Sequence, residues 1–429
     1  MRLLLSLVLL FSLSYSSLAV PTALRPQRRS RSFRVERVKR SDYVPHGASA
    51  LSKAYRKYGI APTGFTGVDM DDFEPYEIPK SAMSSSQDSD DDQTGAVAAK
   101  SVQSDVEFIS TVTIGGQNIS MDFDTGSSDM WVLNSDMEAL YTQGHTIYHP
   151  DESSTFSKVE NGQFDISYGD SSWAKGTVCR DTVSIGGATV ENQAFGLPST
   201  VSQSFMLDIN SNGLVGLGFS SITTLQPRQK TFFDNIGPDL EEPVLTSLLH
   251  SDGVGEFEFG IVDHSKYSGQ LVNVSVDNSN GFWQFDSGCF AVGSGSLQNL
   301  TDTSTAIADT GTSLMLVSDQ MLEAYYGQVN NAQYSTSVGA YVYPCEEELP
   351  NLTVALGDKY QATIPGSFMK FSEIGTNTTT GGTVCYGGIQ SNSDLGMMVF
   401  GDVFLKALFV IFDQRGPSLA LASPKYVGL

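Results

Sequence analysis

Short runs in which apolar and polar residues alternate make up most of the chain after residue 106. Residues 108–114 and 182–185 show this period of two, and Gly-Gly or Gly-Asp pairs separate such runs. Alternation of this kind predicts half-buried strands joined by tight turns. Helices are predicted only at residues 243–249, 318–326 and 402–407. The pattern therefore indicates an all-β protein.

The start of the chain has a different pattern. Met1 and Arg2 precede an apolar stretch over residues 3–13, and small residues follow up to Ala19. This order is typical of a secretory signal peptide, and the stretch is too short to span a membrane. No later apolar stretch is long enough to span one, and the C-terminus lacks a lipid-anchor tail. We expect a secreted, extracellular protein with no membrane partner; a vacuolar location is the alternative.

Residues 20–60 are basic, whereas the rest of the chain is acidic. Beside Glu36 and Asp42 this segment holds many Lys and Arg residues, while residues 101–429 hold 11 Lys or Arg and 37 Asp or Glu. A basic arm often binds nucleic acid or a membrane. Here a signal peptide precedes the arm and an acidic body follows it, so its natural partner is its own chain. We interpret the arm as a propeptide and expect no nucleic-acid partner.

A Ser- and Asp-rich stretch at residues 81–100 contains few apolar residues and is typical of an exposed linker. The mature N-terminus is expected between residues 95 and 101, which leaves enough chain for two lobes with their own cores. The predicted organisation is a signal peptide at 1–19, a propeptide and linker at 20–97, an N-terminal lobe at 98–270 and a C-terminal lobe at 271–429.

One short phrase occurs twice. Asp124 begins Asp-Thr-Gly-Ser and Asp309 begins Asp-Thr-Gly-Thr, and a predicted strand precedes each acid. A triplet of two apolar residues and a glycine follows far downstream of each, at 214–216 and 399–401. Such a duplication predicts two equivalent halves, and packing them face to face would bring the two carboxylates into one site.

Two such carboxylates cannot both ionise easily. At about 3 Å and an effective dielectric near 20 they repel by about 5 kcal/mol, which separates their titrations by about four pH units. The ionised acid can then take a proton from water while the protonated one gives a proton to a carbonyl oxygen. This is general acid and base catalysis of amide hydrolysis. The titrations belong to the pair, not to either residue alone.

The motifs resemble those of the pepsin-like aspartic endopeptidases, most closely the secreted fungal enzymes of the aspergillopepsin, penicillopepsin and endothiapepsin type. The resemblance covers residues 101–429, with its most specific stretches at 123–131, 307–313 and 399–405. It implies two β-barrel-like lobes related by a pseudo-two-fold axis, with a cleft between them. It also implies acid hydrolysis of protein and peptide substrates, inhibition by pepstatin-type compounds, a monomer, and no cofactor.

The resemblance further implies three kinds of support for the acids. One pair of threonine hydroxyls cross-braces the two loops, a second pair of hydroxyls bonds outward from the acids and holds them coplanar, and a pair of glycines allows the close approach. In this order the residues are Thr125 and Thr310, Ser127 and Thr312, and Gly126 and Gly311.

Residues 167–173 resemble the flap hairpin that closes over substrate and excludes water in this family. The resemblance makes Tyr168 the tyrosine at its tip, Gly169 its neighbour, and Trp131 the indole partner of the tyrosine hydroxyl. Tyr168 could instead be an ordinary strand aromatic. The stretch departs from the common fungal flap at Ser171 and Trp173.

Two further acids, Asp122 and Asp170, match positions that line the pocket for the side chain before the cleaved bond. In similar fungal enzymes, acids here pair with a basic side chain in a pocket otherwise suited to Leu or Phe. The hypothesis is cleavage after hydrophobic residues and also after Lys. Alternatively, Asp170 only caps its turn.

The propeptide carries its own hypothesis. A lysine within residues 51–58 is expected to reach the acid pair and silence it near neutral pH. Acid would neutralise carboxylates, loosen the arm and permit self-cleavage. The propeptide would thus be an intramolecular inhibitor.

Four cysteines fit a secreted chain with disulfides. Cys345 and Cys385 match the second-lobe disulfide of the family, whereas Cys179 and Cys289 are left open between a second bridge and free thiols. Five Asn-x-Ser/Thr sequons fit a glycoprotein. His145 and His149 stand four apart, but Gly144 and Pro150 beside them argue against a helical zinc motif, so no metal site is predicted.

A rival from another class is a catalytically silent pepsin-like binding or inhibitor protein. Such proteins lose an acid, the flap tyrosine or the loop glycines. All of these residues are present here.

Overall fold

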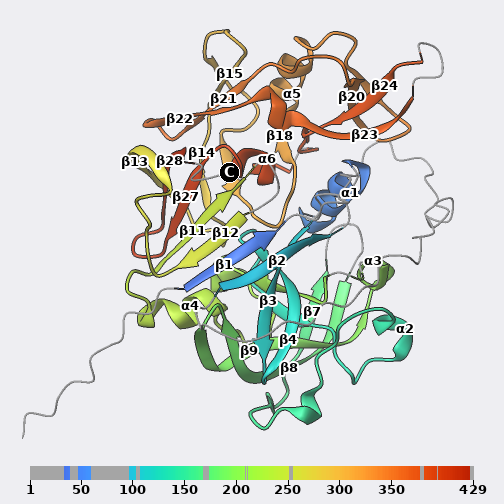
Figure 1. Cartoon of the computed structure of the whole chain (residues 1–429), viewed down its shortest axis with the longest axis vertical. Helices are drawn as coiled ribbons and strands as arrows, with labels where there is room; N and C mark the ends of the chain where they lie inside the picture. Colours follow the sequence, from blue (N-terminus) through green and yellow to red (C-terminus); the bar gives the residue numbers. More distant parts are fainter. Residues whose placement is uncertain are drawn as a thin grey trace, which may run out of the picture.

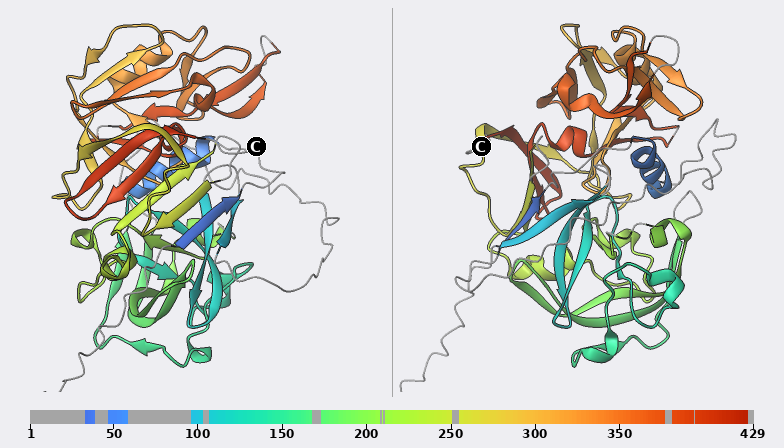
Figure 2. Two further views of the ribbon diagram at one scale, coloured as in Figure 1. Left: turned by 60° about the vertical axis from the view of Figure 1, so that its left-hand side comes forward. Right: turned by 45° about the vertical axis from the view of Figure 1, so that its right-hand side comes forward.

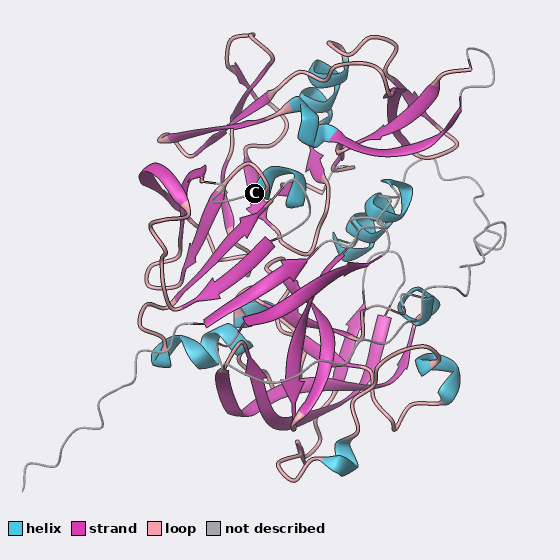
Figure 3. Ribbon diagram, in the orientation of Figure 1, coloured by secondary structure: helices cyan, strands magenta, loops and turns pink. Residues whose placement is uncertain are grey.

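The computed structural model describes residues 33–38, 47–58, 96–102, 107–167, 173–207, 209, 211–250, 255–376, 381–393 and 395–425. Strands dominate these residues and helices are few and short (Figures 1 and 3). One lobe, drawn in teal and green, lies below a central sheet, and a second lobe, drawn in orange and red, lies above it (Figure 1). The predicted two-lobed all-β architecture is confirmed.

The lower lobe is a sheet of strands that follow one another closely in sequence. A tight hairpin joins β3 and β4 through Gly115 and Gly116, both at positive φ, where glycine is favoured. The strands of this part are β2 (Ala96–Val102), β3 (Glu107–Ile114), β4 (Gln117–Asp124), β5 (Met130–Val132), β6 (Ser157–Lys158), β7 (Phe164–Ser167), β8 (Trp173–Ile185), β9 (Ala188–Val201) and β10 (Gly213–Gly216).

The central sheet continues from β2 and joins the lobes. Its strands run in the order β13-β28-β27-β11-β12-β1, and β1 lies between β12, to which it is antiparallel, and β2, to which it is parallel. Their bounds are β1 (Phe33–Val38), β11 (Val244–Leu249), β12 (Gly255–Phe259), β13 (Tyr267–Ser275), β27 (Phe409–Asp413) and β28 (Ser418–Pro424).

The helix predicted at residues 243–249 was wrong, because this segment forms strand β11. All six residues of β11 are buried, between β12 on one side and β27 on the other. Its apolar residues stand at 244, 245, 248 and 249, with Thr246 and Ser247 between them, so the sequence shows no strand alternation and fits the spacing of a helix face equally well.

Three smaller sheets build the upper lobe. A five-stranded sheet carries the second acid, and two four-stranded sheets lie above it. The strands are β14 (Gln284–Asp286), β15 (Cys289–Val292), β16 (Gln298–Asn299), β17 (Thr305–Ala308), β18 (Met315–Val317), β19 (Gln333–Ser335), β20 (Ala340–Pro344), β21 (Leu352–Leu356), β22 (Tyr360–Ile364), β23 (Lys370–Thr376), β24 (Thr383–Gly387), β25 (Ile389–Ser391) and β26 (Met398–Phe400).

The other two helix predictions agree with the structure. Ser318 caps α5, since its hydroxyl accepts a hydrogen bond from the Met321 backbone N–H. A short helix also lies within the segment predicted at 402–407. The described α-helices are α1 (Gly47–Tyr58), α2 (Ala139–Thr142), α3 (Gln203–Leu207), α4 (Phe232–Ile236), α5 (Asp319–Tyr326) and α6 (Asp402–Leu405).

The two halves repeat around the acids. In the lower lobe β10 runs parallel to β4, with Val215 opposite Phe123, and in the upper lobe β26 runs parallel to β17, with Val399 opposite Ile307. Each triplet of two apolar residues and a glycine therefore supplies the strand beside an acid-bearing strand. These strands are buried, so both loops project from rigid supports.

Helix α1, from the basic arm, lies between the two lobes (Figure 2). Its start is fixed to the upper lobe, because the Gly47 N–H donates to Ser372 Oγ at 3.0 Å. A Cβ at Gly47 would lie 2.1 Å from the Tyr386 ring, so only glycine fits there. One face of the helix is buried, through Ala50, Leu51, Ala54 and Tyr55.

Cys345 and Cys385 form a disulfide, as the resemblance implied. The two cysteines left open are free thiols in opposite lobes: Cys179 is buried in β8, and Cys289 is half-buried in β15. Within the described residues no helix has the length and apolar character needed to cross a membrane.

Candidate active site

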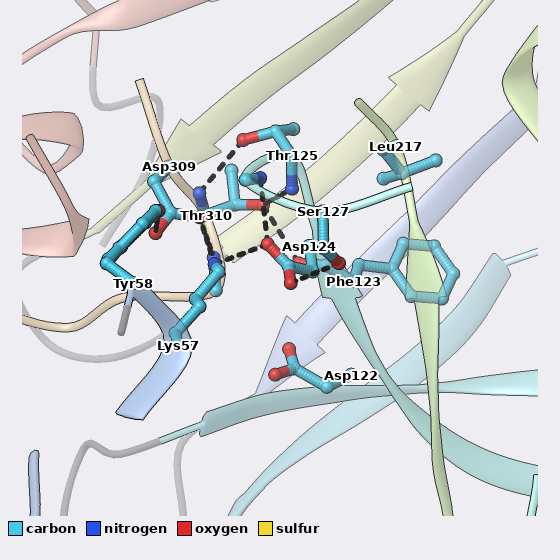
Figure 4. A network of polar contacts seen from close by, with 12 residues as sticks. Lys57, Tyr58, Asp122, Phe123, Asp124, Thr125, Ser127, Leu217, Asp309 and Thr310 are labelled. Carbon is cyan, nitrogen blue, oxygen red and sulfur yellow. Dashed lines mark hydrogen bonds and ion pairs between the residues drawn. The ribbon is translucent and has the colours of Figure 1, made fainter. Parts of the chain in front are cut away.

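The two acids meet where the lobes face each other (Figure 4). Asp124 is the last residue of β4, and Asp309 directly follows β17; both side chains are buried. The Lys57 Nζ, at the end of α1, lies 2.5 Å from Asp124 Oδ1 and 2.5 Å from Asp309 Oδ1. Those two oxygens can therefore be no more than twice that distance apart, and the carboxylates share one site.

Reciprocal hydrogen bonds brace the two loops. The Thr125 N–H donates to Thr310 Oγ1 at 3.1 Å, and the Thr310 N–H donates to Thr125 Oγ1 at 3.0 Å. The Thr125 hydroxyl donates to the Ala308 carbonyl at 2.9 Å, and the Thr310 hydroxyl to the Phe123 carbonyl at 2.8 Å. Each hydroxyl thus satisfies two buried backbone groups of the opposite lobe, as the resemblance implied.

The loop glycines leave no room for a side chain. A Cβ at Gly126 would lie 2.5 Å from Asp309 Oδ1, and one at Gly311 would lie 2.6 Å from Asp124 Oδ1. Their backbone N–H groups instead donate to the carboxylates, Gly126 to Asp124 at 2.8 Å and Gly311 to Asp309 at 3.0 Å. Any larger residue would push the acids apart.

The outward hydrogen bonds are not symmetric. The Ser127 hydroxyl donates to Asp124 Oδ2 at 2.6 Å. The matching hydroxyl of Thr312 is buried beside Asp309 and helps to lower the pKa of that acid, although no hydrogen bond of normal geometry joins the two. The Tyr58 hydroxyl of α1 also donates to Asp309 Oδ2 at 2.5 Å, whereas the hydroxyl on Asp124 Oδ2 comes from its own loop.

The electrostatics of the two acids differ accordingly. Burial raises the pKa of Asp124 to about 6, against the opposing charge of Lys57 and with help from the charge of Asp309. Burial also acts to raise the pKa of Asp309, but the charge and hydrogen bond of Lys57, with help from the hydroxyls of Thr312 and Tyr58, lower that pKa to about 2. Near neutral pH a cation therefore lies between two carboxylates that attract it.

Lys57 and Tyr58 keep their protons at this place. Burial acts to lower the pKa of Lys57, but the two carboxylates outweigh it and raise that pKa. Burial and the carboxylate charges raise the pKa of Tyr58 well above its usual value. The ammonium group occupies the space between the acids, so a water molecule and a peptide carbonyl cannot reach it while α1 is docked.

Sequence reasoning named residues 51–58 but did not choose among their lysines and did not foresee Tyr58. A signal was present: Lys53 and Lys57 are four residues apart, so they share one face of a helix. Lys53 Nζ bonds Asp122 Oδ2 at 3.2 Å, and Asp122 is buried two residues before the first acid. Helical spacing therefore predicts that both lysines face the acids of the cleft.

The flap lies mostly outside the described residues. Tyr168, Gly169 and Asp170 fall there, as do Ser171 and Ser172, while β7 and β8 lead into and out of the segment. Trp131, the expected partner of Tyr168, is described in β5, where its ring is buried and meets Phe205 edge-on at 4.9 Å between centroids.

The described residues contain no group of three His, Cys, Asp or Glu side chains placed to hold a metal ion. The chemistry of the site is that of its two carboxylates. Once the cleft is open, the pair can hold a water between an ionised and a protonated acid, which is the arrangement that general acid and base hydrolysis needs.

Comparison with known proteins points to the same chemistry. The family model described as eukaryotic aspartyl protease matches residues 107–424. An aspergillopepsin A-like aspartic endopeptidase of Aspergillus fumigatus is 56% identical, covering 98% of this chain and 99% of its own length.

Two further relatives also span nearly the whole chain. An aspartic protease of Coccidioides posadasii is 47% identical over 95% of this chain and 93% of its own. The aspergillopepsin-1 of Aspergillus pseudoglaucus is 40% identical over 94% of this chain and 95% of its own. The similarity therefore includes the basic arm as well as the two lobes.

Proposed function

The chain belongs to the eukaryotic aspartyl protease family and is an aspartic endopeptidase, and we propose that it is an exported zymogen that acts in acid. In this proposal residues 1–19 are the signal peptide, 20–97 the propeptide and linker, 98–270 the N-terminal lobe and 271–429 the C-terminal lobe. Residues 1–19 lie outside the described residues, so export rests on their sequence pattern.

Asp124 and Asp309 are the proposed catalytic pair. The observation that carries this assignment is one lysine nitrogen at 2.5 Å from both carboxylates, which come from equivalent loops of the two halves. With the lysine gone, one acid would take a proton from water and the other would protonate the carbonyl oxygen of the peptide bond. Thr125, Thr310 and the loop glycines would hold the pair in register.

Helix α1 is the proposed inhibitory element. Lys57 bridges the acids and Tyr58 bonds Asp309, so the helix occupies the place of substrate at neutral pH. Burial raises the pKa of Asp124 to about 6 and Lys57 acts against that rise, so Asp124 is ionised and paired with Lys57 near neutral pH. Acid would protonate Asp124, remove one partner of Lys57 and release the helix for cleavage.

Substrate choice is proposed to follow the two pocket acids. The enzyme would cleave after hydrophobic residues and also after Lys, with Asp122 and Asp170 pairing with the lysine ammonium and Tyr168 closing over the chain. Support comes from Lys53, which already places a cation on buried Asp122. The test compares Asp170→Ser with the parent on two peptides that differ only in Lys or Phe before the cleaved bond. Equal losses of activity on both peptides would refute a charge role for Asp170.

The central test uses the purified full-length zymogen and denatured globin between pH 2.5 and 7. Cleavage is expected below about pH 6, together with shortening of the zymogen at its N-terminus and inhibition of both by pepstatin. A zymogen that stays at full length at pH 4, or cleavage that pepstatin does not affect, would overturn the proposal.

A further inference from the structure

Tyr55 of α1 occupies a specific slot on the upper lobe. Its side chain is 6% exposed, its hydroxyl donates to the Ser391 carbonyl at 2.9 Å, and the Ser393 hydroxyl donates to it at 3.1 Å. Burial raises the pKa of Tyr55 to about 12, so the hydroxyl keeps its proton and can donate. The slot therefore binds both the ring and the polar end of a tyrosine.

Tyr55 forms one wall of a pocket of about 260 Å³. Residues of the enzyme body form the other walls, among them Leu322 of α5, Tyr341 of β20 and Gln390 of β25. Gln390 is fixed in place, because its amide donates to the carbonyls of Tyr341 and Gly387. These residues come from the rigid upper lobe, so the slot is formed without the propeptide.

The slot lies within reach of a bound substrate. Tyr55 and Lys57 are two residues apart in a helix, about 5.5 Å between Cα atoms, and Lys57 contacts the acids directly. Allowing for the two side chains, the Tyr55 hydroxyl lies within about 18 Å of the pair, which extended peptide covers in about five residues. Peptide leaving the acids can therefore reach the space that Tyr55 vacates.

We propose that in the mature enzyme this slot is a tyrosine-selective subsite for peptide substrates, two to five residues from the cleaved bond. The inference rests on the proposed function, because α1 must leave before substrate enters. Leu322 and Tyr341 would pack against the ring, while the Ser391 carbonyl and the Ser393 hydroxyl bond the phenol. A phenylalanine would leave these polar groups without a partner, so the slot should prefer Tyr over Phe.

The test uses enzyme activated by acid from the full-length zymogen. One parent peptide with Phe before the cleaved bond carries Tyr, Phe or Ala at each position from two to five residues on either side, and kcat/KM is measured at pH 4. At one position Tyr should exceed Phe by about fivefold, in line with one or two lost hydrogen bonds, and exceed Ala by more than about tenfold.

Two variants assign that preference to the slot. Ser393→Ala should lower the Tyr-to-Phe ratio at that position by about threefold. Ser294→Ala, in the exposed β15–β16 turn, is the matched control and should leave the ratio unchanged.

Two results would overturn the inference while leaving the protease assignment intact. The first is cleavage of all peptides with no preference for Tyr at any scanned position. The second is a Tyr preference that Ser393→Ala does not change. If no peptide is cleaved at all, the proposed function fails, and this subsite fails with it.

Discussion

Asp124 and Asp309 occupy equivalent places in two halves built alike, yet their surroundings differ. Asp124 is held by its own loop, through the Gly126 N–H and the Ser127 hydroxyl. Asp309 has the matching glycine bond, but its outer oxygen accepts from Tyr58 of α1. Their pKa values move apart, to about 6 for Asp124 and about 2 for Asp309.

The difference shows where the asymmetry of the site comes from. The repeated strands and the reciprocal threonine bonds treat the two acids equally, whereas α1 contributes a cation to both and a phenol to only one. The strands and threonine bonds of the body are therefore symmetric, and α1 adds an asymmetry through the phenol that bonds Asp309 alone. Three sets of substitutions and one pH series test the symmetry of the pair and the effect of α1.

The largest effect should come from the acids themselves. Asp124→Asn and Asp309→Asn should each lower kcat/KM of acid-activated enzyme by at least about 10³-fold, because each removes one member of an acid and base pair. The variants would be activated by an added protease, since they cannot process themselves. Asp286→Asn, an exposed neighbour in β14, is the control. Unequal losses of more than about tenfold would contradict a symmetric pair.

Lys57→Met should come next. Removing one partner of a buried ion pair costs about 3–5 kcal/mol, so docking of α1 should weaken by at least about a hundredfold at pH 7. Hydrogen exchange of residues 47–58 measures this docking. Lys53→Met should have a smaller effect, because Lys53 is more exposed than Lys57 and its 3.2 Å bond to Asp122 is longer than the 2.5 Å bonds of Lys57. Equal effects of the two changes would show that the acid pair is not the main anchor.

The threonine brace should be symmetric. Thr125→Val and Thr310→Val each remove two hydrogen bonds between the loops and should lower the free energy of unfolding by similar amounts, about 2 kcal/mol. Urea unfolding of the mature enzyme measures this. Thr353→Val, which loses a bond to Thr363 on an exposed strand pair, should cost less than about 0.5 kcal/mol. If only one of the two variants loses stability, one threonine supplies most of the hydrogen-bond energy between the loops, and the brace is not symmetric.

The pH dependence should be the mildest effect. In the docked state burial raises the pKa of Asp124 to about 6 against the charge of Lys57, so below about pH 6 the acid is protonated and its charge no longer holds Lys57. The contribution of Asp309 should persist to about pH 2. The opening equilibrium of α1, obtained from its hydrogen exchange after division by the intrinsic exchange rate at each pH, should rise by about tenfold or less between pH 7.5 and 5.5. If an Asp124→Asn zymogen shows the same rise, protonation of Asp124 is not its cause.

Sequence alone located the acids and the family because both depend on short, repeated motifs. The loops at Asp124 and Asp309 must fit the same chemistry, so their residues repeat 185 positions apart. The contacts of Tyr58 could not be predicted in this way. They depend on how a separate helix docks, and no repeat within the body encodes that.

The errors have a physical reason of the same kind. The helix prediction at residues 243–249 was wrong because the apolar residues at 244, 245, 248 and 249 show no strand period, and the neighbours β12 and β27 decide the structure of this segment. Cys179 and Cys289 could not be assigned from spacing, because their places in opposite lobes follow from the tertiary fold. Local pattern predicts an element best when one face of that element meets solvent.

The crossed threonine bonds also bear on how such a molecule could have arisen. The Thr125 N–H donates to the Thr310 hydroxyl and the Thr310 N–H donates to the Thr125 hydroxyl, at 3.1 and 3.0 Å. Two identical single-lobe chains related by a two-fold axis would make the same pair of bonds across their interface. The geometry thus suits an ancestral homodimer whose copies later fused, and it explains why neither modern lobe can complete its buried backbone hydrogen bonds without the other.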